Sequence, residues 1–383
     1  MKRRTLILTE IIAPYRIPVF NALAARSDVD LHVVFLSETD PNLRQWHIYK
    51  EEINFSYEIL RSWRRRLGKH NLLFNAGVGK ALRRAHPETI ICGGYNYLAS
   101  WQAAFWAKQN NIPLLLWSES NSADKRSKHT LVEILKKRFL RLCCGSIAAG
   151  VASREYLLEL GMPAESIFVA PNAVDVEMYA SAARAARSHS SGLRAEHDLP
   201  QRYFLCVGRL VEEKGVFDLL AAYARLDETT RTRVALVFVG EGAARADLAR
   251  RASQVHTGVI KFCGWVHRER ISEFYALAEA LVFPTHSDPW GLVVNEAMAC
   301  SLPIVASEVA GCVADLVRGS ENGFTFRQGD IDGLVNSLQT FAEQPDLSKR
   351  MGERSFEIIQ ANTPEACAAG FSKAISFACG GMR

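Results

Sequence analysis

The chain has 383 residues, of which 48% are hydrophobic and 23% are charged, and its formal net charge is +5. This composition is typical of a folded globular protein and excludes a disordered chain, and the length exceeds what one hydrophobic core usually serves, so we expect two domains. No apolar run approaches the roughly 18 residues of a membrane span, and the N-terminal run at residues 6–8 is too short for a signal peptide, so we expect a buried strand there.

The first half of the chain alternates short apolar runs with helical patterns, which is typical of a largely parallel sheet covered by helices. The strands that we expect are residues 6–8, 31–35, 89–92, 113–117 and 146–149. Open sheets of this kind bind ligands at the carboxyl ends of their strands. Polar residues that follow these runs are therefore candidates for contacting a ligand.

Six such residues are candidates for contacting an acceptor or a phosphate group, and they are Glu10, Tyr15, Arg16, Tyr95, Asn96 and Glu119. Two interpretations of Glu10, Tyr15 and Arg16 stay open. These residues can contact the ligand, or the neighbouring prolines can simply delimit a helix on which Arg16 is a surface charge. For the strand end at residues 118–121, the alternative is a plain helix-capping role of a serine.

Charge is distributed unevenly along the chain. Residues 1–150 hold 23 Lys and Arg against 12 Asp and Glu, a net charge of +11, whereas residues 151–383 carry a net charge of −6. A basic half can face anionic lipid or a phosphorylated acceptor, or it can simply be a solvated surface. The densest basic stretch, residues 61–70, is expected to be a loop that borders the acceptor or contacts lipid headgroups. Nucleic acid is not expected as a partner, because no nucleic-acid-binding module accompanies this stretch.

The nine cysteines are scattered through mostly apolar contexts, and none forms a Cys-x-x-Cys pair. They are expected to be small buried hydrophobic residues in the reducing cytoplasm, and neither a zinc site nor a disulfide framework is predicted. Residues 180–200 are rich in Ala, Ser and Arg with weak periodicity, so we predict an interdomain hinge at 176–200. The predicted domains are then residues 1–175 and 201–362, and a final helix within 363–383 returns to the first domain.

The second domain begins with a strand at residues 203–207 that ends at Gly208, followed by Arg209 and, five residues later, Lys214. Gly208 permits close approach to the backbone, and two cations near it can neutralise a diphosphate. The alternative is a surface salt bridge from one of these cations to Glu212 or Glu213. The next strand, at residues 234–239, leads to a tight turn that begins with Gly240 and Glu241.

The most informative stretch is residues 283–307, where a strand, a loop, a helix at 292–299 and a second strand follow one another. Two carboxylates lie eight positions apart in it, Asp288 in the loop and Glu296 on the helix. Pro289 keeps Asp288 extended at the helix entrance, and the unpaired N–H groups around Gly291 and Leu292 favour an anion. A ligand that carries both hydroxyls and phosphates, such as a nucleotide sugar, fits this arrangement.

This stretch resembles the nucleotide-sugar motif of the retaining glycosyltransferases of family 4, which have the GT-B fold. Glu296 is followed by Ala-Met-Ala at 297–299 as in the family, whereas Asp288 stands where the family usually has Glu. Residues 171–175, Pro-Asn-Ala-Val-Asp, are similar to the family's Pro-Asn-Gly-Val-Asp. Residues 14–20 are similar to the Pro-Tyr-Arg-x-Pro-x-Phe opening of a subgroup that builds bacterial polysaccharides.

The resemblance implies an α/β protein of two Rossmann-like domains that face each other across a cleft. It implies that Arg209 and Lys214 bind the donor's diphosphate, that Asp288 holds the donor sugar and that Glu296 holds the ribose. The other residues that the resemblance indicates for donor binding are Gly208, Gly240, Glu241, Val266, Trp290, Gly291 and Leu292. Because the loop at 260–266 meets the base through its backbone, the base can be uracil, guanine or adenine.

The function expected from this resemblance is transfer of a hexose to a saccharide acceptor, with retention of anomeric configuration and without a metal or other cofactor. The subgroup and the basic first domain suggest a lipid-linked acceptor in bacterial surface polysaccharide synthesis. A cytoplasmic protein on the inner face of the membrane is the expected location. The first domain lacks the His that much of the family has at a strand end. Two alternatives therefore stay open, a nucleotide-sugar epimerase of the same fold and a non-catalytic sugar-nucleotide-binding subunit.

Overall fold

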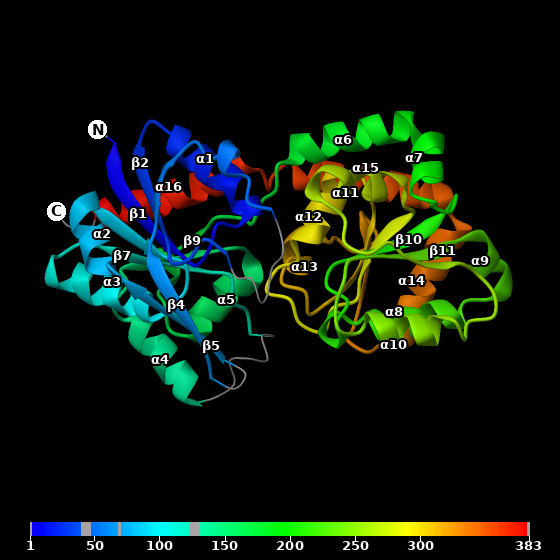
Figure 1. The fold of residues 1–383 in the computed structure, drawn as a ribbon, viewed down its shortest axis with the longest axis horizontal. Coiled ribbons are helices and arrows are strands. Elements are labelled where there is room, and N and C mark those ends of the chain that lie inside the picture. Colours follow the sequence, from blue (N-terminus) through cyan, green and yellow to red (C-terminus); the bar gives the residue numbers. More distant parts are fainter. Residues whose placement is uncertain (1, 40–46, 68–69, 123–129, 381–383) are drawn as a thin grey trace. The chain divides into compact units, whose positions relative to one another are not determined.

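The computed structural model describes residues 2–39, 47–67, 70–122 and 130–380, and it divides into two compact units (Figure 1). Unit 1 contains Met1–Val174 and Thr363–Arg383, and unit 2 contains Asp175–Asn362. Each unit is built on a parallel sheet with helices packed against it, which confirms the predicted pair of Rossmann-like domains. No helix in the described part of the chain is long and apolar enough to cross a membrane.

The sheet of unit 1 has seven parallel strands in the order β3-β2-β1-β6-β7-β8-β9. Its strands are β1 (Arg3–Thr9), β2 (Val29–Phe35), β3 (Ser56–Ile59), β6 (Thr89–Cys92), β7 (Leu114–Ser118), β8 (Gly145–Ala148) and β9 (Ile167–Val169). All five predicted strands are present, and their central residues are buried on both faces, as parallel strands usually are. The edge strands β3 and β9 were not predicted, because they are short and partly exposed.

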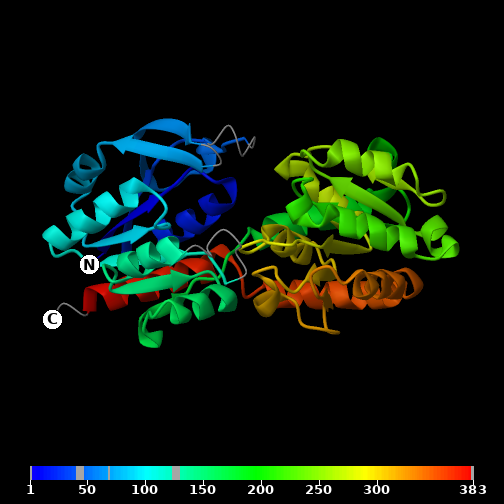
Figure 2. The same ribbon diagram turned by 90° about the horizontal axis from the view of Figure 1, so that it is seen from below.

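Helices cover both faces of this sheet, and the last helix of the chain is one of them. The helices of unit 1 are α1 (Ile17–Ala25), α2 (Val78–Ala85), α3 (Leu98–Gln109), α4 (Thr130–Leu140), α5 (Val151–Glu159) and α16 (Pro364–Gly380). α16 packs against α1 and β9, and Figures 1 and 2 show it in red beside the blue and green elements of unit 1. The contact is close at Gly370, where an added Cβ would lie 2.3 Å from the carbonyl oxygen of Val169.

The basic stretch at residues 61–70 was predicted to be a loop, and this prediction was wrong. It forms β4 (Arg61–Leu67), which pairs antiparallel with β5 (His70–Ala76) in a separate two-stranded hairpin. Its two middle residues, 68 and 69, lie outside the described residues. The hairpin has the alternating burial of a strand pair, since Leu73 on one face is buried while Trp63 and Phe74 on the other are exposed. The many charged residues made this period-2 pattern hard to recognise in the sequence.

The sheet of unit 2 has six parallel strands in the order β12-β11-β10-β13-β14-β15. Its strands are β10 (Tyr203–Val207), β11 (Ala235–Val239), β12 (Ile260–Phe262), β13 (Ala280–Phe283), β14 (Ile304–Ser307) and β15 (Gly323–Phe326). Its helices include α8 (Val216–Arg225), α9 (Glu228–Arg233), α10 (Arg245–Ala252), α11 (Arg268–Leu277), α12 (Leu292–Ala299), α13 (Val313–Leu316), α14 (Ile331–Glu343) and α15 (Pro345–Ile359). The predicted helix at 292–299 is therefore α12.

Residues 176–200 differ from the predicted hinge. They form α6 (Val176–Ser188) and α7 (Ser190–Glu196), which cluster with unit 2. α6 begins at Asp175, whose carboxylate accepts a hydrogen bond from the N–H of Met178, and it packs against α11 and α12. Its buried face consists of Val176, Tyr179, Ala180, Ala183 and Ala186. The sequence concealed this helix because alanine marks a buried face only weakly.

Replacement of Ala183 tests whether α6 belongs to the core of unit 2. Ala183 is fully buried, so Ala183→Asp would place an unpaired carboxylate against α11 and α12. We expect it to lower the free energy of unfolding by about 2 kcal/mol or more. The matched change Ala185→Asp, on the exposed face of the same helix, should cost less than about 0.5 kcal/mol. Equal chemical-denaturation midpoints for the two variants would show that α6 is a linker.

Candidate functional site

The candidate donor site of unit 2 lies where the strand order of its sheet reverses. β10 and β13 are neighbours in the sheet, but the chain proceeds outward from β10 to β11 and β12 before it returns to β13. Loops that follow two such strands diverge and leave a crevice at the carboxyl edge, where ligands of open α/β sheets bind. Gly208 and Arg209 follow β10, and Asp288 lies in the loop after β13.

Two glycines bring the first loops of this edge into backbone contact. Gly208 has φ +141° and Gly240 has φ +132°, and a Cβ on Gly240 would lie only 1.9 Å from the carbonyl oxygen of Gly208. Glycine is therefore required at Gly240, because any side chain would separate the two turns. Glu241 follows it with an exposed side chain that pairs with Arg245 at 3.3 Å.

The two predicted phosphate-binding cations, Arg209 and Lys214, differ in whether they form an ion pair within the described chain. The Arg209 side chain is exposed and forms no ion pair within the described chain. The Lys214 Nζ lies 2.5 Å from Asp288 Oδ2 and 3.3 Å from the carbonyl oxygen of Ser287. The partner of Lys214 is thus Asp288, and not a neighbouring glutamate. This ion pair joins the loop after β10 to the loop after β13.

Asp288 is held by hydrogen bonds from several directions. Its second carboxylate oxygen accepts the N–H of Trp290 at 3.0 Å, and its carbonyl oxygen accepts the N–H of Gly311 at 3.1 Å. The side chain is 19% exposed, so a ligand can reach it. The carboxylate is therefore positioned from two sides and keeps an open approach.

Trp290 and Gly291 shape the entrance of α12. The Trp290 ring is buried, and its Nε1–H donates to the Oδ1 of Asn295 at 2.8 Å. Gly291 has φ +103°, and a Cβ there would lie 2.5 Å from the Phe283 ring, so only glycine is accommodated. The first backbone N–H groups of α12, from Leu292 onward, then have no partner within the helix and favour an anion.

Glu296 is partly buried on α12 between two tyrosines that the sequence did not identify. Tyr275 on α11 donates its hydroxyl to Glu296 Oε2 at 2.7 Å, and Tyr179 on α6 donates a second hydrogen bond. Burial raises the pKa of Glu296, and the two hydroxyls and Arg268 oppose that rise. Tyr179 was missed because it lies in the segment predicted as a hinge, more than a hundred residues before Glu296.

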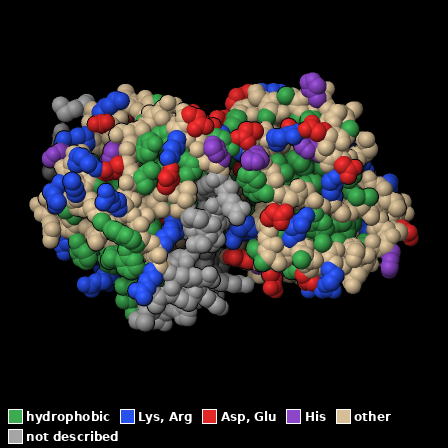
Figure 3. All heavy atoms as spheres, viewed as in Figure 1, with side chains coloured by type: hydrophobic (Ala, Val, Ile, Leu, Met, Phe, Trp, Pro, Cys, Tyr) green, Lys and Arg blue, Asp and Glu red, His purple; other side chains and the backbone are tan. Residues whose placement is uncertain are grey.

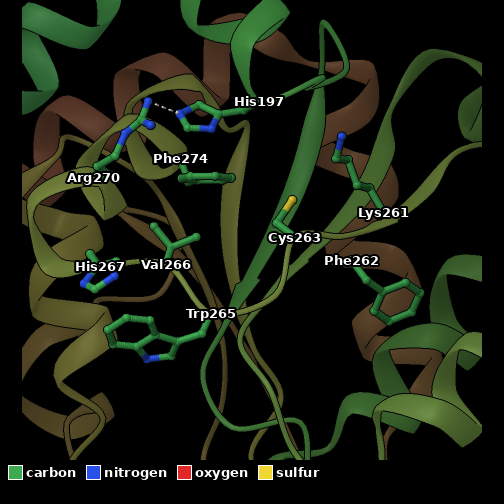
Figure 4. Close-up of a pocket in the computed structure, with 9 residues that line it drawn as sticks. All are labelled: His197, Lys261, Phe262, Cys263, Trp265, Val266, His267, Arg270 and Phe274. Atoms are coloured by element: carbon green, nitrogen blue, oxygen red, sulfur yellow. Dashed lines mark hydrogen bonds between the residues drawn. The ribbon is translucent and has the colours of Figure 1, made fainter. Parts of the chain in front are cut away.

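Val266 lines a cavity of about 420 Å³ at the edge of the sheet in unit 2. The cavity is lined by His197, Lys261, Phe262, Cys263, Trp265, Val266, His267, Arg270 and Phe274. In Figure 4 the rings of Trp265 and His267 lie together at one end and those of His197 and Phe274 at the other. Trp265 is 48% exposed, so an aromatic surface beside Val266 is free to stack on a planar ligand.

The carboxyl edge of unit 1 holds a charged cluster around Arg16. The Arg16 guanidinium donates to Thr9 Oγ1 at 2.8 Å, pairs with Glu119 at 3.2 Å and lies 4.3 Å from the centre of the Trp117 ring. Burial lowers the pKa of Arg16, but Tyr15 and Glu119 more than offset it, so the group stays charged. Arg16 is therefore part of a built polar cluster, and the interpretation as a plain surface charge was wrong.

The other acceptor-side candidates divide into two groups. Glu10 interacts with the hydroxyl of Tyr97, whose pKa is raised by burial and by Glu10. Tyr95 lies instead beside Lys136, and its hydroxyl also interacts with Ser120. Asn96 is exposed next to Tyr95. Neither Tyr97 nor Lys136 was identified from the sequence, because both belong to helical or turn segments without a motif.

The described residues contain no group of three or more His, Cys, Asp or Glu side chains that could hold a metal ion. Two Asp-x-Asp sequences occur outside the candidate sites. Asp28 accepts hydrogen bonds from Arg26 and Ser372, and Asp330 caps the N-terminus of α14. That the activity requires no metal stays a prediction.

Comparison with known families identifies both units. Residues 193–357 match the family described as glycosyl transferases group 1, and residues 20–178 match glycosyltransferase family 4. Among solved structures, Anabaena Alr3699/HepE in complex with UDP superposes with a TM-score of 0.75 at 20% identity, covering 98% of this chain and 100% of that one. Sucrose-phosphate synthase from Thermosynechococcus elongatus gives a TM-score of 0.74 at 20% identity, with 97% and 98% covered. These likenesses confirm the GT-B fold.

Curated relatives match over shorter stretches. Sulfoquinovosyl transferase SQD2 of Arabidopsis thaliana is 30% identical over 176 residues, which cover 45% of this chain and 32% of the relative. Glycogen synthase of Mycobacterium tuberculosis is 29% identical over 278 residues, covering 70% of this chain and 63% of the relative. The lipopolysaccharide core biosynthesis glycosyltransferase LpsE of Rhizobium meliloti is 30% identical, with 43% and 47% covered. The chain thus spans 32% to 63% of the length of these three relatives.

The raised pKa of Glu296 predicts a pH-dependent stability difference. The folded protein keeps the Glu296 proton at pH values where the unfolded chain has released it, so ionisation of Glu296 destabilises the fold as the pH rises above its ordinary value of 4.5. Glu296→Gln cannot ionise, and we expect its thermal midpoint to rise relative to the wild type between pH 4.5 and 7.5. Glu353→Gln, at an exposed position on α15, removes one carboxylate as a control. A constant difference for Glu296→Gln over this pH range would contradict the assignment.

Proposed function

Because the chain belongs to the family 4 glycosyltransferases of the GT-B fold, we propose that it transfers a hexose from a nucleoside-diphosphate sugar to a saccharide acceptor. Unit 2 binds the donor and unit 1 binds the acceptor, and the anomeric configuration is retained. The observation that carries this proposal is the arrangement after β10 and β13. The exposed cation of Arg209, an oriented carboxylate and a helix N-terminus share one edge of the sheet there.

The donor's diphosphate binds Arg209, Lys214 and the backbone N–H groups at the start of α12. Arg209 is available for this role because it is exposed and unpaired within the described chain. Lys214 is already neutralised by Asp288, so it exchanges part of this contact for the diphosphate when the donor binds. These groups stabilise the negative charge that builds on the leaving nucleoside diphosphate, and they do so without a metal ion.

Asp288 accepts hydrogen bonds from hydroxyls of the donor sugar once Lys214 turns toward the diphosphate. Glu296 accepts hydrogen bonds from the hydroxyls of the ribose, and its two tyrosine partners support this role. Tyr179 and Tyr275 each occupy one direction of approach and fix the carboxylate, which leaves further lone pairs for the ligand. The cost of burying Glu296 is thus offset when the donor supplies additional hydrogen-bond donors.

The base lies against Val266, and the exposed Trp265 ring beside it offers a surface for stacking. Neither residue selects among uracil, guanine and adenine. Anabaena Alr3699/HepE has been solved with UDP and with UDP-glucose, which supports a nucleotide sugar as the donor class. The acceptor binds the carboxyl edge of unit 1, near the Arg16–Glu119 pair, where charged groups can hold sugar hydroxyls.

The acceptor is lipid-linked in our proposal, and the β4–β5 hairpin is the surface that meets an anionic membrane. One face of the hairpin docks on unit 1, where the Asn75 Nδ2 donates to the carbonyl oxygen of Leu36 at 2.5 Å and Leu73 is buried. The opposite face is solvent-exposed and carries Arg61, Trp63, Arg65, Leu72, Phe74 and Ala76. Figure 3 shows basic and apolar side chains side by side on this face of unit 1.

The pairing register places aromatic and basic residues of this exposed face in adjacent rows. Trp63 lies opposite Phe74, and Arg65 lies opposite Leu72, with Trp63 59% and Phe74 41% exposed. A lipid interface favours both exposed aromatic rings and cations near its anionic headgroups. Water favours only the cations, so the combination on this face fits a membrane surface. The relatives that act in lipopolysaccharide biosynthesis, such as LpsE, support a surface polysaccharide as the product class.

The roles of the two acids are separable by binding and turnover. A thermal-shift panel of UDP, GDP and ADP first identifies the base, because a ligand at a hundredfold excess over its Kd stabilises by about 2.7 kcal/mol. With that nucleotide, Glu296→Gln should raise the calorimetric Kd of the free diphosphate roughly ten- to a hundredfold. Asp288→Asn should bind the diphosphate as the wild type does, because the donor sugar that Asp288 contacts is absent from the diphosphate, and should lower kcat/KM for the full donor by a similar factor.

Two exposed acids on α15 provide matched controls, and Asp346→Asn and Glu353→Gln should change neither quantity. Normal turnover by Asp288→Asn, or unchanged diphosphate binding by Glu296→Gln, would refute the assignment of the acids. Nuclear magnetic resonance of the first-formed product distinguishes retention from inversion. Product formation without any acceptor would instead indicate an epimerase.

The hairpin surface predicts binding to vesicles that contain phosphatidylglycerol. Each cation near an anionic surface contributes about 1 kcal/mol, so Arg61→Gln/Arg65→Gln should lower vesicle partitioning roughly thirtyfold at low salt. Trp63→Ser/Phe74→Ser should also weaken it. The control Arg233→Gln/Arg250→Gln removes the same charge from exposed positions of unit 2 and should have little effect. Equal partitioning of wild type into anionic and neutral vesicles would exclude this surface as a lipid site.

A further inference from the structure

Lys136 on α4 is a buried cation that the proposed transfer reaction does not use. Its side chain is 2% exposed, and its Nζ donates to the hydroxyl of Tyr156 at 2.5 Å. The Nζ also lies 5.0 Å from the centre of the Tyr156 ring and 5.7 Å from that of Tyr95. Within the described chain no carboxylate forms an ion pair with it. Among the residues that the structure describes, the groups around this ammonium are therefore neutral.

Several other shielded cations in this protein have a carboxylate partner. Arg16 pairs with Glu119 in unit 1, and in unit 2 Lys214 pairs with Asp288 and Lys261 with Asp198. An uncompensated buried charge costs several kcal/mol in general. Burial lowers the pKa of Lys136, but the hydroxyls of Tyr156 and Tyr95 more than offset this, so the ammonium form persists. Within the described part of the chain, Lys136 thus has no countercharge of the kind that these other cations have.

Lys136 belongs to a cluster that lies where open α/β sheets bind ligands. Tyr95 follows β6, Ser120 follows β7 and Tyr156 lies on α5, which follows β8, so the cluster sits at the carboxyl edge of the sheet in unit 1. The Tyr95 hydroxyl interacts with both Lys136 and Ser120. Tyr95 and Ser120 are partly exposed, so the cluster reaches the surface through them. Ligands of open α/β sheets bind at this edge.

We propose that Lys136, with the hydroxyls of Tyr95, Ser120 and Tyr156, binds a phosphate group carried by the acceptor. This inference rests on the proposed function, because it specifies the acceptor as a phosphorylated saccharide. A compact ammonium surrounded by hydroxyl donors suits the oxygens of a phosphate, whereas a carboxylate is better matched by the planar fork of arginine. The phosphate supplies a countercharge that none of the described residues gives Lys136.

Inorganic phosphate tests this site in the full-length protein. Thermal midpoints are measured with increasing sodium phosphate against sodium chloride of equal ionic strength. The wild type should be stabilised by phosphate, and Lys136→Met should require at least about tenfold more phosphate for the same shift. Lys137→Met, which removes the same charge from the exposed neighbouring position of α4, should respond as the wild type does.

Two further variants separate this site from the donor site. Arg209→Gln should keep the response if the phosphate binds unit 1, and would lose it if the phosphate binds the diphosphate site of unit 2. Tyr95→Phe, at a partly exposed position where folding is not at risk, should weaken phosphate binding several-fold. The proposal is overturned if Lys136→Met and Tyr95→Phe respond as the wild type does, or if phosphate stabilises the wild type no more than chloride.

Nucleotide binding distinguishes failure of this proposal from failure of the proposed function. Lys136→Met should bind the nucleoside diphosphate with an unchanged Kd, because its site lies in unit 1. A wild type that binds no nucleotide would refute the proposed function and leave the phosphate result standing. Phosphatidylglycerol vesicles should bind Lys136→Met and wild type equally, because a buried group does not meet a flat bilayer. A defect with vesicles but not with phosphate would assign Lys136 to the membrane surface instead.

Discussion

The ion pair between Lys214 and Asp288 is the interaction on which the candidate donor site depends. It joins two loops that leave neighbouring strands in opposite directions, and it adds to the backbone hydrogen bond that the N–H of His286 donates to the carbonyl oxygen of Glu213 between the same loops. Asp288 then orients the entrance of α12 through the N–H of Trp290. A diphosphate and a sugar together present both a negative charge and hydroxyls, so they can replace both halves of this internal pair. The pair therefore keeps both charged groups at the carboxyl edge where the donor is proposed to bind.

Glu296 connects the site to the rest of unit 2. Its carboxylate accepts hydrogen bonds from the hydroxyls of Tyr275 on α11 and Tyr179 on α6, and these two helices also pack against each other. The burial that raises the pKa of Glu296 is a cost to the folded state, which is common for groups that bind ligands. α6 is consequently part of the binding unit, because one wall of the Glu296 environment is made from it.

Two cations of unit 1, the partly buried Arg16 and the buried Lys136, have different environments. Arg16 donates to Thr9 and pairs with Glu119, so its charge is balanced inside the protein. Lys136 has only neutral hydroxyls and aromatic rings around it within the described chain. A protein interior stabilises the first arrangement by itself, whereas the second becomes favourable when an anion arrives. This difference in charge balance, more than proximity to a strand end, distinguishes a structural cation from a ligand-binding one.

The sequence alone determined the two parallel α/β domains, the strands of their sheet centres and the α12 helix, because short apolar runs and the segment around Asp288 are local signals. It also indicated two candidates for donor binding, Arg209 just after the strand at 203–207 and Glu296 eight positions after Asp288. Only the tertiary structure decided that residues 176–188 are a packed helix, that residues 61–76 form a hairpin, and which partners the charged groups have. Alanine-rich and arginine-rich segments carry weak local patterns, and the contacts of Tyr179 and Lys136 join residues that are far apart along the chain or lack any motif. Such contacts exist only once the elements have packed.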